Sequence, residues 1–571
     1  MRRSGVDAPW LAVGVVVAMG IAVLAIHELG PDRQRFARER KLDTLTTRVV
    51  PVAAEPAADV PAVPPEVASA RNEWPLANHD YANSRATTSS RIDSSTVGTL
   101  GMSWQRGLRS ASKWGTAASG PLIAKGVVYF QDLGSNVFAI DAGSGSLKWK
   151  HVVRQKAFGP NGPALGWGKL YAPNGDRHIV ALDLASGKRI WRTPLGGPTG
   201  QQQPVAYGGY LLTGIAAGRK ARGSGKVLKT ALLKGGASGF AYALREHDGS
   251  VAWEFQTVTK GFWGNPDLNS GAGIWFPPAV DASSGLTYWS TGNPAPAPGT
   301  GGHPNGSSRP GPNLYSNTML ALRLESGKLA WHHQVASHEL FHHDFQNPPI
   351  LVDSAGRQLV VGSGKLGVVF AFDRRTGKLV WKRPVGRHEH DGLKRLPPGK
   401  VVTVYPGFWG GVETPGAYAD GTLYFEVVNM PTPYTATAWE AKDGQTSVEN
   451  LEGRTEYDKG TSELVALDAA TGAIKWSRPF PAPGFGAATV VNDLVFTATY
   501  DGMIYAVSRA DGKVIWRFQA PGGINAWPAV AGNVIVWPVG LGRKPVLLAL
   551  KLGAAGKPVR PDARPALEDE G

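Results

Sequence analysis

The phrase AIDAGSGSLKW at residues 139–149 recurs along the chain and decides its fold. It resembles the end of an apolar strand, a polar turn whose glycine permits a positive φ, and an alternating strand that ends in a large aromatic. A hairpin of this kind cannot bury its own face, so neighbouring copies must stack. Six further copies keep alanine first, glycine seventh and tryptophan eleventh: ALDLASGKRIW at 181–191, ALREHDGSVAW at 243–253, ALRLESGKLAW at 321–331, AFDRRTGKLVW at 371–381, ALDAATGAIKW at 466–476 and AVSRADGKVIW at 506–516.

A second β-rich run precedes most copies, such as GVVYFQD at 126–132 and LVFTATYDG at 494–502. Three or four strands in a repeat of about 40–50 residues indicate the blade of a β-propeller. Two stretches remain without a partner, namely TVGTLGMSW, which ends at Trp104, and the apolar runs NVIVWPVG and VLLALKL between 533 and 552. Joining the two ends would complete an eighth blade and close the ring.

We therefore predict an all-β fold, an eight-bladed β-propeller over residues 73–552, in which Trp104 and the seven phrase tryptophans pack between blades. Two long stretches interrupt the repeat, at 292–317 and at 429–462. Functional residues tend to lie in long loops of this kind inside a regular array.

The composition narrows the possible chemistry. The 571 residues include 73 Gly, 43 Pro and 42% hydrophobic residues, which is enough to build a core. The chain has no Cys, which excludes disulfides, thiolate zinc sites, iron–sulfur clusters and attachment of c-type haem. The net charge of +15 is spread along the chain and not gathered into a basic stripe, so we expect no nucleic-acid partner.

The N-terminal stretch 8–26 carries no charge and is long enough to cross a membrane as a helix. A secretory signal peptide is the alternative, because two arginines precede the stretch. We predict one transmembrane helix, a membrane anchor or uncleaved signal, within residues 1–30. A Pro- and Ala-rich linker at 31–72 and a flexible tail at 553–571 complete the predicted organisation.

The basic residues on either side of this stretch bear on its orientation in the membrane. Five basic residues at 33–41 outnumber the two arginines in front of it. A literal positive-inside count would leave the bulk of the chain in the cytoplasm.

Three segments resemble the pyrroloquinoline quinone (PQQ) dependent alcohol dehydrogenases, a family whose catalytic domain is an eight-bladed propeller with Trp-docking repeats. EWPLANHDYANSRATTSSRIDSSTVGTLGMSW, from Glu73, resembles the opening segment of that family. GAGIWFPPAVDASSGLTYWSTGNPAP at 271–296 resembles its central cofactor region, and KLGVVFAFDRRTGKLVW at 365–381 resembles its next blade. The repeats alone are shared with non-enzymatic propellers, whereas the GNPAP and GKLG contexts are more specific.

The resemblance implies roles for three residues, each with a plainer alternative. Trp275 would lie flat under the quinone, since an indole offers a large stacking face; it could instead be one more packing tryptophan. Asn293 would be an oxygen ligand for the family's calcium ion, although an Asn-Pro pair also simply starts a turn. Lys365 would hydrogen-bond the quinone oxygens, or it could be a solvated loop lysine.

The chain also departs from the family pattern. Ser238 stands where the family has a calcium-binding Glu, and Ala118-Ser119-Gly120-Pro121 replaces Glu-Ala-Thr-Pro. The segment that carries the family's catalytic Asp reads HELFHHD here, which puts His342 at the place of the base. Asp344 falls where some members place an extra carboxylate for a larger cation, so it is both a catalytic and a metal-ligand candidate. With two carboxylates lost, a site for calcium or another cation becomes doubtful.

Histidines gather in the same region, and this is consistent with a transition-metal site made of N and O ligands. Core or solvated histidines are the alternative, because adjacent strand residues point to opposite faces. Seven of the 13 lie between 332 and 390: His332, His333, His338, His342, His343, His388 and His390.

Two functions from different classes follow. The first is a membrane-tethered, PQQ-dependent dehydrogenase that oxidises an alcohol or a sugar and passes electrons to an external acceptor, with the propeller on the extracytoplasmic side of the cell membrane. The second is a non-catalytic propeller that scaffolds envelope proteins, similar to the lipoprotein of outer-membrane assembly complexes. A scaffold would have a filled axis, whereas a cofactor protein would bring Trp275, Asn293 and Lys365 together in a pocket.

Overall fold

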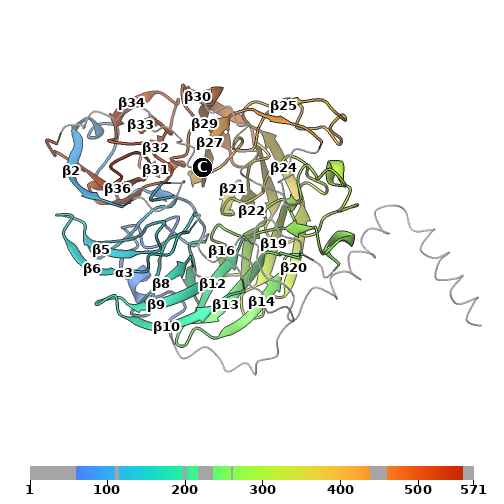
Figure 1. Ribbon diagram of the computed structural model, residues 1–571. Helices are drawn as coiled ribbons and strands as arrows, with labels where there is room; N and C mark the ends of the chain where they lie inside the picture. Colours follow the sequence, from blue (N-terminus) through green and yellow to red (C-terminus); the bar gives the residue numbers. More distant parts are fainter. Residues whose placement is uncertain are drawn as a thin grey trace, which may run out of the picture. The chain divides into compact units, whose positions relative to one another are not determined.

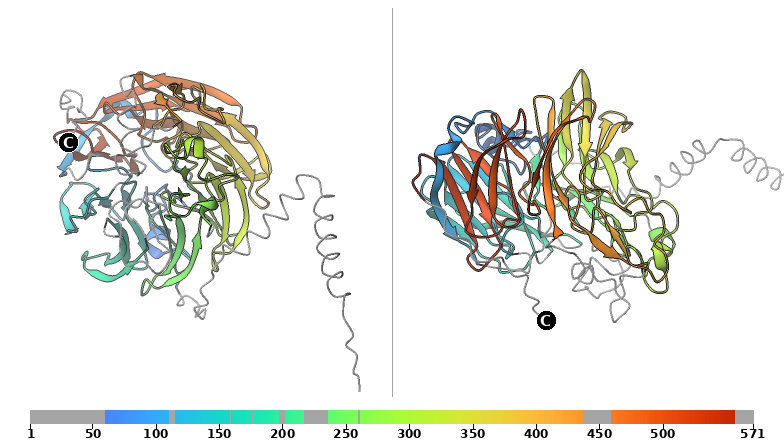
Figure 2. Two further views of the ribbon diagram at one scale, coloured as in Figure 1. Left: turned by 45° about the vertical axis from the view of Figure 1, so that its right-hand side comes forward. Right: turned by 90° about the horizontal axis from the view of Figure 1, so that it is seen from above.

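The computed structural model describes residues 60–109, 115–157, 159–175, 177–196, 202–216, 236–258, 261–436 and 459–556. Within these residues, eight sheets follow one another around a ring (Figure 1), as the views of Figure 2 also show. Seven are four-stranded and antiparallel, and the eighth carries a short parallel strand beside its four antiparallel ones. The predicted all-β, eight-bladed propeller is therefore confirmed. The membrane helix expected within residues 1–30 lies outside the described residues. Among the described residues, no helix combines the length and the apolar character needed to cross a membrane.

Blades 1 to 4 are built in chain order, from the strand nearest the axis to the outermost one. Their strands are β3 (Leu122–Ala124), β4 (Val127–Gln131), β5 (Val137–Asp141) and β6 (Leu147–His151); β7 (Ala164–Gly166), β8 (Lys169–Asn174), β9 (His178–Asp183) and β10 (Arg189–Pro194); β11 (Val205–Tyr207), β12 (Tyr210–Ile215), β13 (Phe240–Arg245) and β14 (Val251–Gln256); and β16 (Ala279–Asp281), β17 (Leu286–Ser290), β19 (Thr318–Arg323) and β20 (Leu329–Gln334).

Blades 5 to 8 continue in the same way, except that the last blade takes its outer strand from the N-terminal side of the chain. Their strands are β21 (Ile350–Ser354), β22 (Arg357–Gly362), β23 (Val368–Asp373) and β24 (Leu379–Pro384); β26 (Ala417–Ala419), β27 (Thr422–Asn429), β29 (Thr461–Asp468) and β30 (Ile474–Phe480); β31 (Thr489–Val491), β32 (Leu494–Ala498), β33 (Met503–Ser508) and β34 (Val514–Gln519); and β35 (Ala529–Ala531), β36 (Val534–Val539), β37 (Val546–Leu552) and β2 (Leu100–Gly107).

Short elements lie between the blades. They are the helix α3 (Pro65–Ser69), the single turns η1 (Val97–Thr99), η3 (Phe262–Gly264) and η4 (Pro304–Gly306), the strand β1 (Ala86–Thr87) beside β31, and the two-stranded pairs β15 (Ser270–Gly271) with β18 (Pro294–Ala295) and β25 (Val402–Val404) with β28 (Thr432–Tyr434).

Trp104 and six of the seven phrase tryptophans dock on the turn of the next blade, and so pack between blades as predicted. Trp331 donates its Nε1–H to Arg374 O at 3.1 Å. Its ring lies against Gly377, where φ is +70° and a Cβ would be 2.4 Å from the indole. The same bond, always to the fourth residue of the next phrase, joins Trp104 to Ala142, Trp149 to Leu184, Trp191 to Glu246, Trp253 to Leu324, Trp381 to Ala469 and Trp476 to Arg509. Trp516 packs against the core shared by blades 7, 8 and 1.

Blade 8 closes the ring with an eighth copy of the phrase that is split between the two ends of the chain. Trp104 in β2 stands opposite Ala549 in β37, just as Trp149 stands opposite Ala139 within blade 1. Both pairs sit beside a shift in strand register. The predicted joining of the ends is confirmed.

The segment 74–87 ties the inner strands together at one end of the axis. Backbone bonds join it to blades 1, 4, 5, 6 and 7, through Ile123, Val280, Leu351, Tyr418 and Val490. The Tyr81 hydroxyl donates to Ala206 O of blade 3 at 2.8 Å, and Arg85 Nη2 donates to Pro528 O beside blade 8 at 3.3 Å. Just upstream, Gly168 of blade 2 donates its N–H to Glu66 Oε1 at 2.7 Å. One stretch of chain therefore contacts every blade.

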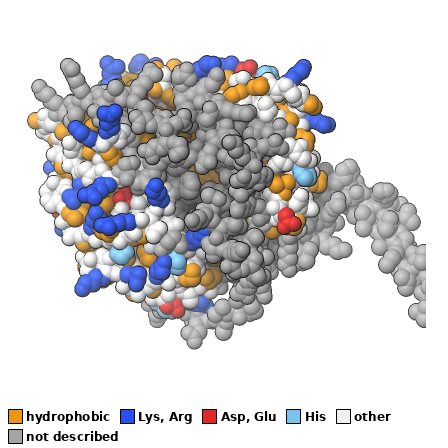
Figure 3. Space-filling model, viewed as in Figure 1, with side chains coloured by type: hydrophobic (Ala, Val, Ile, Leu, Met, Phe, Trp, Pro, Cys, Tyr) orange, Lys and Arg blue, Asp and Glu red, His pale blue; other side chains and the backbone are white. Residues whose placement is uncertain are grey.

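Charged side chains are dispersed over the outside of the ring. Lys and Arg residues are visible at many points of the face in Figure 3, with few Asp and Glu among them. This agrees with the even spread of basic residues along the sequence.

The close approach of each indole to a glycine can be tested in blade 5. We expect Gly356→Ala, at φ +73° with open space around the added methyl, to cost roughly 1–2 kcal/mol in the free energy of unfolding, because only the backbone is strained. Gly377→Ala has a similar φ but also meets Trp331, so it should cost roughly 1–3 kcal/mol more. Chemical denaturation measures both variants, and equal losses would contradict the packing role of the indole.

Glu426 provides a pH test of the same core. It is fully buried in β27, and burial raises the pKa of Glu426 to about 8. A carboxyl whose pKa is higher in the folded state stabilises the fold at low pH, and this stability is lost as pH rises from about 4.5 to about 8, because the unfolded chain releases its proton first. Glu426→Gln should therefore gain stability relative to the parent over that range, by at most about 1.4 kcal/mol per pH unit. Denaturation curves at several pH values measure this difference. The exposed Glu325→Gln serves as the control, and parallel pH curves for the parent and Glu426→Gln would refute the expectation.

Candidate functional site

A small pocket lies among the loops that precede the innermost strands. Its walls include Trp275, Phe276 and Pro277 before β16, Pro160 before β7, Pro415 before β26 and Trp527 before β35. Ala77 and Asn78, from the segment that ties the blades together, line it as well. Because residues from blades on several sides of the ring meet here, the pocket lies on the axis of the propeller.

Trp275 and Asn293 come together around Asp344. The Asn293 backbone N–H donates to Asp344 Oδ1 at 2.8 Å. A Cβ on the preceding Gly292 would lie 2.5 Å from the Trp275 ring and 2.7 Å from the same carboxylate oxygen. Only glycine at this position therefore lets the indole and the carboxylate approach one another.

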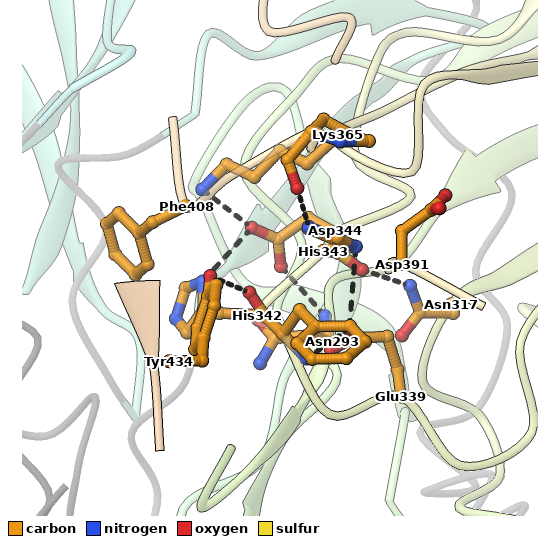
Figure 4. Close-up of polar contacts among 12 residues, drawn as sticks. Asn293, Asn317, Glu339, His342, His343, Asp344, Lys365, Asp391, Phe408 and Tyr434 are labelled. Carbon is orange, nitrogen blue, oxygen red and sulfur yellow. Dashed lines mark hydrogen bonds and ion pairs between the residues drawn. The ribbon is translucent and has the colours of Figure 1, made fainter. Parts of the chain in front are cut away.

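Lys365 completes the group from the loop between β22 and β23 of blade 5. Its Nζ lies 3.1 Å from Asp344 Oδ2, and both side chains are buried. The ammonium also faces the rings of Phe408 and Trp409, at 5.0 and 4.6 Å from their centroids. Figure 4 shows the amine reaching the carboxylate beside the Phe408 ring.

His342 and Asp344 lie on one tight turn. His342 has a φ of +63°, in the left-handed region that non-glycine residues adopt rarely. Its Nδ1 lies 3.8 Å from Asp344 Oδ2, its ring lies against Phe408, and its side chain is 18% exposed. The five residues that the resemblance singled out, Trp275, Asn293, His342, Asp344 and Lys365, thus form one group, of which Trp275 lines the pocket.

Residues of the first insertion, 292–317, hydrogen-bond the segment that carries His342 and Asp344. Arg309 is fully buried and donates to Glu339 O at 2.5 Å and to Pro296 O at 2.9 Å. Asn317 donates its Nδ2–H to His343 O at 2.5 Å. Most of the second insertion, residues 437–458, lies outside the described residues.

Burial dominates the protonation of the neighbouring groups. It lowers the pKa of His342 to about 4, against the Asp344 carboxylate, which raises it. His343 is lowered to a pKa of about 4 for the same reason, and its Nε2–H donates to Pro406 O at 2.8 Å. Burial raises the pKa of Glu339 to about 7. Both imidazoles are therefore neutral at neutral pH and add no positive charge beside Lys365.

Glu413 is a member of the site that the sequence did not indicate. Its side chain is 9% exposed, and Oε1 has no hydrogen-bond partner among the described residues. Burial raises the pKa of Glu413 to about 8, with Asp344 adding to the rise and Lys365 opposing it. Val412, next to it, donates its N–H to Gly364 O at 3.0 Å, which holds this loop beside Lys365.

The donor set does not fit a calcium ion. Ser238 lies in the expected place, since it pairs with Gly271 beside Asn293, but its hydroxyl donates to Gly239 O at 3.0 Å and accepts the Val258 N–H at 3.1 Å. The position of the second family carboxylate is the neutral His342. Asp344 Oδ2 already faces the Lys365 ammonium. Calcium takes six to eight oxygen ligands with several carboxylates among them, and these residues do not supply them.

The histidine-rich region does not form a transition-metal site either. Within the described ranges, no three His, Asp or Glu side chains are placed to share a metal ion. The imidazoles contact separate partners: His388 contacts Asp391 at 2.7 Å, His390 contacts Thr403 O at 2.8 Å and His333 contacts Gly377 O at 3.2 Å.

A planar aromatic ligand fits the chemistry of the pocket better. The aromatic residues Trp275, Phe276 and Trp527 line the pocket, and Phe276 stacks on Trp527 with centroids 5.9 Å apart. The nearby buried hydroxyls of Ser119 and Thr414 have no hydrogen-bond partner among the described residues. Unpaired buried polar atoms beside an aromatic slot suit a flat ligand that carries acceptor oxygens.

Comparisons with known proteins agree with this chemistry. A family model for the glucose, ethanol and alcohol dehydrogenase β-propeller domain, the PQQ domain, matches residues 224–398. A quinohemoprotein alcohol dehydrogenase, ADH IIB of Pseudomonas putida, is 28% identical over 520 residues, covering 80% of this chain and 71% of its own length. Over about four fifths of its length, the chain is similar to the quinoprotein alcohol dehydrogenases. The lanthanide-dependent methanol dehydrogenase of Methylorubrum extorquens is 26% identical over 537 residues, covering 81% and 84% of the two chains.

The fold of this quinoprotein-like propeller also matches solved structures. The quinohemoprotein alcohol dehydrogenase of Comamonas testosteroni superposes with a TM-score of 0.71 at 22% identity, covering 87% of this chain and 82% of that one. A second family model, that of the outer membrane protein assembly factor BamB, matches residues 102–209 and 367–541.

One signal in the sequence marks the axial residues that the resemblance did not reveal. A proline stands one or two positions before the innermost strand in seven of the eight blades, at Pro121, Pro163, Pro204, Pro277, Pro349, Pro415 and Pro528. The residues around these prolines face the axis, and they include Trp527 and Thr414. Once the phase of the repeat is known, Glu413 can therefore be placed near the axis from sequence alone.

Proposed function

We propose that this chain binds PQQ in its axial pocket and oxidises an alcohol or a sugar, with electrons leaving to an external acceptor. The observation that carries the proposal is the meeting of Trp275, Asn293 and Lys365 around Asp344. These residues are far apart in the sequence, and nothing in blade packing alone requires them to meet. When bound, PQQ would supply the two-electron acceptor that the side chains lack.

The residues of this chain would bind and orient the reactants. The Trp275 face stacks on a flat ring system. The Lys365 ammonium donates to a ligand oxygen and stabilises negative charge that develops there. His342, neutral and partly exposed, is the candidate acceptor for the hydroxyl proton of the substrate, and the Asp344 carboxylate at 3.8 Å would stabilise the imidazolium formed.

A non-catalytic scaffold is the second candidate. It is supported by the match of the BamB family model to the repeat-rich parts of the chain, residues 102–209 and 367–541. The replacement of carboxylates by Ser238 and His342 points in the same direction, because an enzyme of this family would need them for its metal ion.

We further propose that the propeller is tethered to the cell membrane by a single helix within residues 1–30 and lies on the extracytoplasmic side. The uncharged stretch 8–26 supports a tether, and the resemblance to the quinoprotein family supports the side.

PQQ binding and turnover separate the two functions. Titration of the purified chain with PQQ, followed by quenching of tryptophan fluorescence, should show saturable binding, and dye-linked oxidation of alcohols should follow. Trp275→Ala should weaken binding about tenfold through loss of the stacking face, whereas Trp167→Ala, outside the pocket, should not. His342→Ala should lower kcat about a hundredfold while the Kd for PQQ stays the same. Absence of PQQ binding by the folded parent would favour the scaffold.

The location can be measured directly. Alkaline phosphatase fused to the C-terminus should be active in intact cells, because that enzyme folds to its active form only outside the cytoplasm. The fusion should also sediment with membranes. Deletion of residues 1–30 should release it from the membrane fraction. Activity of a fused cytoplasmic reporter instead would place the propeller inside the cell.

A further inference from the structure

The negative charge of Asp344 is balanced inside the protein. The carboxylate is fully buried, and its two oxygens meet the Asn293 N–H at 2.8 Å and the Lys365 ammonium at 3.1 Å. A buried carboxylate without a counter-charge is costly, so one cation at this place is required for the fold itself. Lys365 provides it.

Lys365 is held in place from several sides. The rings of Phe408 and Trp409 face its ammonium opposite the carboxylate and stand perpendicular to one another, at 90°. Such contacts favour a cation over a neutral amine. Its backbone is packed as closely, because a Cβ on Gly411 would lie 2.3 Å from Lys365 O. The ammonium is therefore a fixed charge and not the end of a mobile side chain.

Two positions that would compensate a second cation carry no carboxylate in this chain. The resemblance implies carboxylates at the positions of Ser238 and His342. The Ser238 hydroxyl is hydrogen-bonded to backbone groups, and His342 carries no negative charge. A divalent ion at Asp344 would have to displace Lys365 or lie beside its ammonium, and two like charges at that range repel strongly. Compared with the family pattern, the chain lacks two carboxylate ligands and retains the lysine.

We propose that the Lys365 ammonium takes the place of the metal ion in this propeller, so that the site holds an anionic planar ligand without any metal. Because this role rests on the proposed binding of PQQ beside Trp275, its first test is made without PQQ. The charge that a metal would direct at an oxygen of the ligand comes instead from a side chain that is part of the fold.

The first experiment is metal binding by the full-length chain. Titration with calcium by calorimetry, and with terbium by luminescence sensitised through tryptophan, should show no stoichiometric binding up to millimolar concentrations. The double variant Ser238→Glu with His342→Asp restores two carboxylates and should bind terbium, which proves that the assay detects a site here. Stoichiometric binding by the parent that disappears in Asp344→Asn would overturn the proposal.

The second experiment uses PQQ as the probe. The Kd of the parent should be unchanged by a chelator or by added calcium or lanthanum. Lys365→Met alone leaves Asp344 unpaired, so the double variant Lys365→Met with Asp344→Asn, which keeps the cluster neutral, is measured beside it. Both should bind PQQ at least about tenfold more weakly, whereas the exposed Lys378→Met should match the parent.

The results of the two experiments are read separately. Loss of PQQ binding on chelation, or parent-like binding by both Lys365 variants, would refute the role of the lysine. A parent that binds neither PQQ nor metal would end the proposed function, while the metal titration would still support Lys365 as the cation of this site.

Discussion

The docking of one indole on the glycine turn of the following blade is the contact on which the rest of the structure depends. A four-stranded blade has two apolar faces and no core of its own, so its stability comes from its neighbours. The bond from each indole N–H to the fourth residue of the next phrase sets the spacing between blades, and the absent side chain of the glycine sets their distance. Seven of the eight tryptophans repeat this geometry, so successive blades are joined in nearly the same way around the ring.

Closure has consequences for the axis. With the outer strands spaced by indoles, the innermost strands cannot approach further, and a channel remains that must be filled. The segment 74–87 fills one end and hydrogen-bonds the blades around it. The residues in front of each innermost strand fill the rest with proline and aromatic side chains, and the pocket beside Trp275 is the space they leave.

The fold could be predicted from sequence because the determinant is local and repeated: glycine at position seven and tryptophan at position eleven are visible in every copy, and the split copy at Trp104 and Ala549 follows from counting. That the five residues around Asp344 would lie together could be predicted only through the resemblance, since Asn293 and Lys365 belong to different blades. What pairs with Asp344 could not be predicted, because the ion pair depends on how a turn at His342 meets a loop from blade 5. Glu413 was missed because its place beside Lys365 also depends on how separate loops meet, although Pro415 marks its position in the repeat.

Charge balance explains why the unusual residues of the site belong together. A buried cluster is stable only if its charges nearly cancel. With Lys365 as the cation and Asp344 as the anion, the cluster is already neutral, so any further carboxylate must stay protonated or be absent. Glu413 follows the first course, because burial and Asp344 raise its pKa to about 8. At Ser238 and His342 the carboxylate is absent. Each of these side chains is neutral, whereas a carboxylate there would have no cation to balance its charge. On this view the loss of two carboxylates leaves the retained lysine as the balancing cation, and restoring either carboxylate alone would demand a cation that the present site does not have.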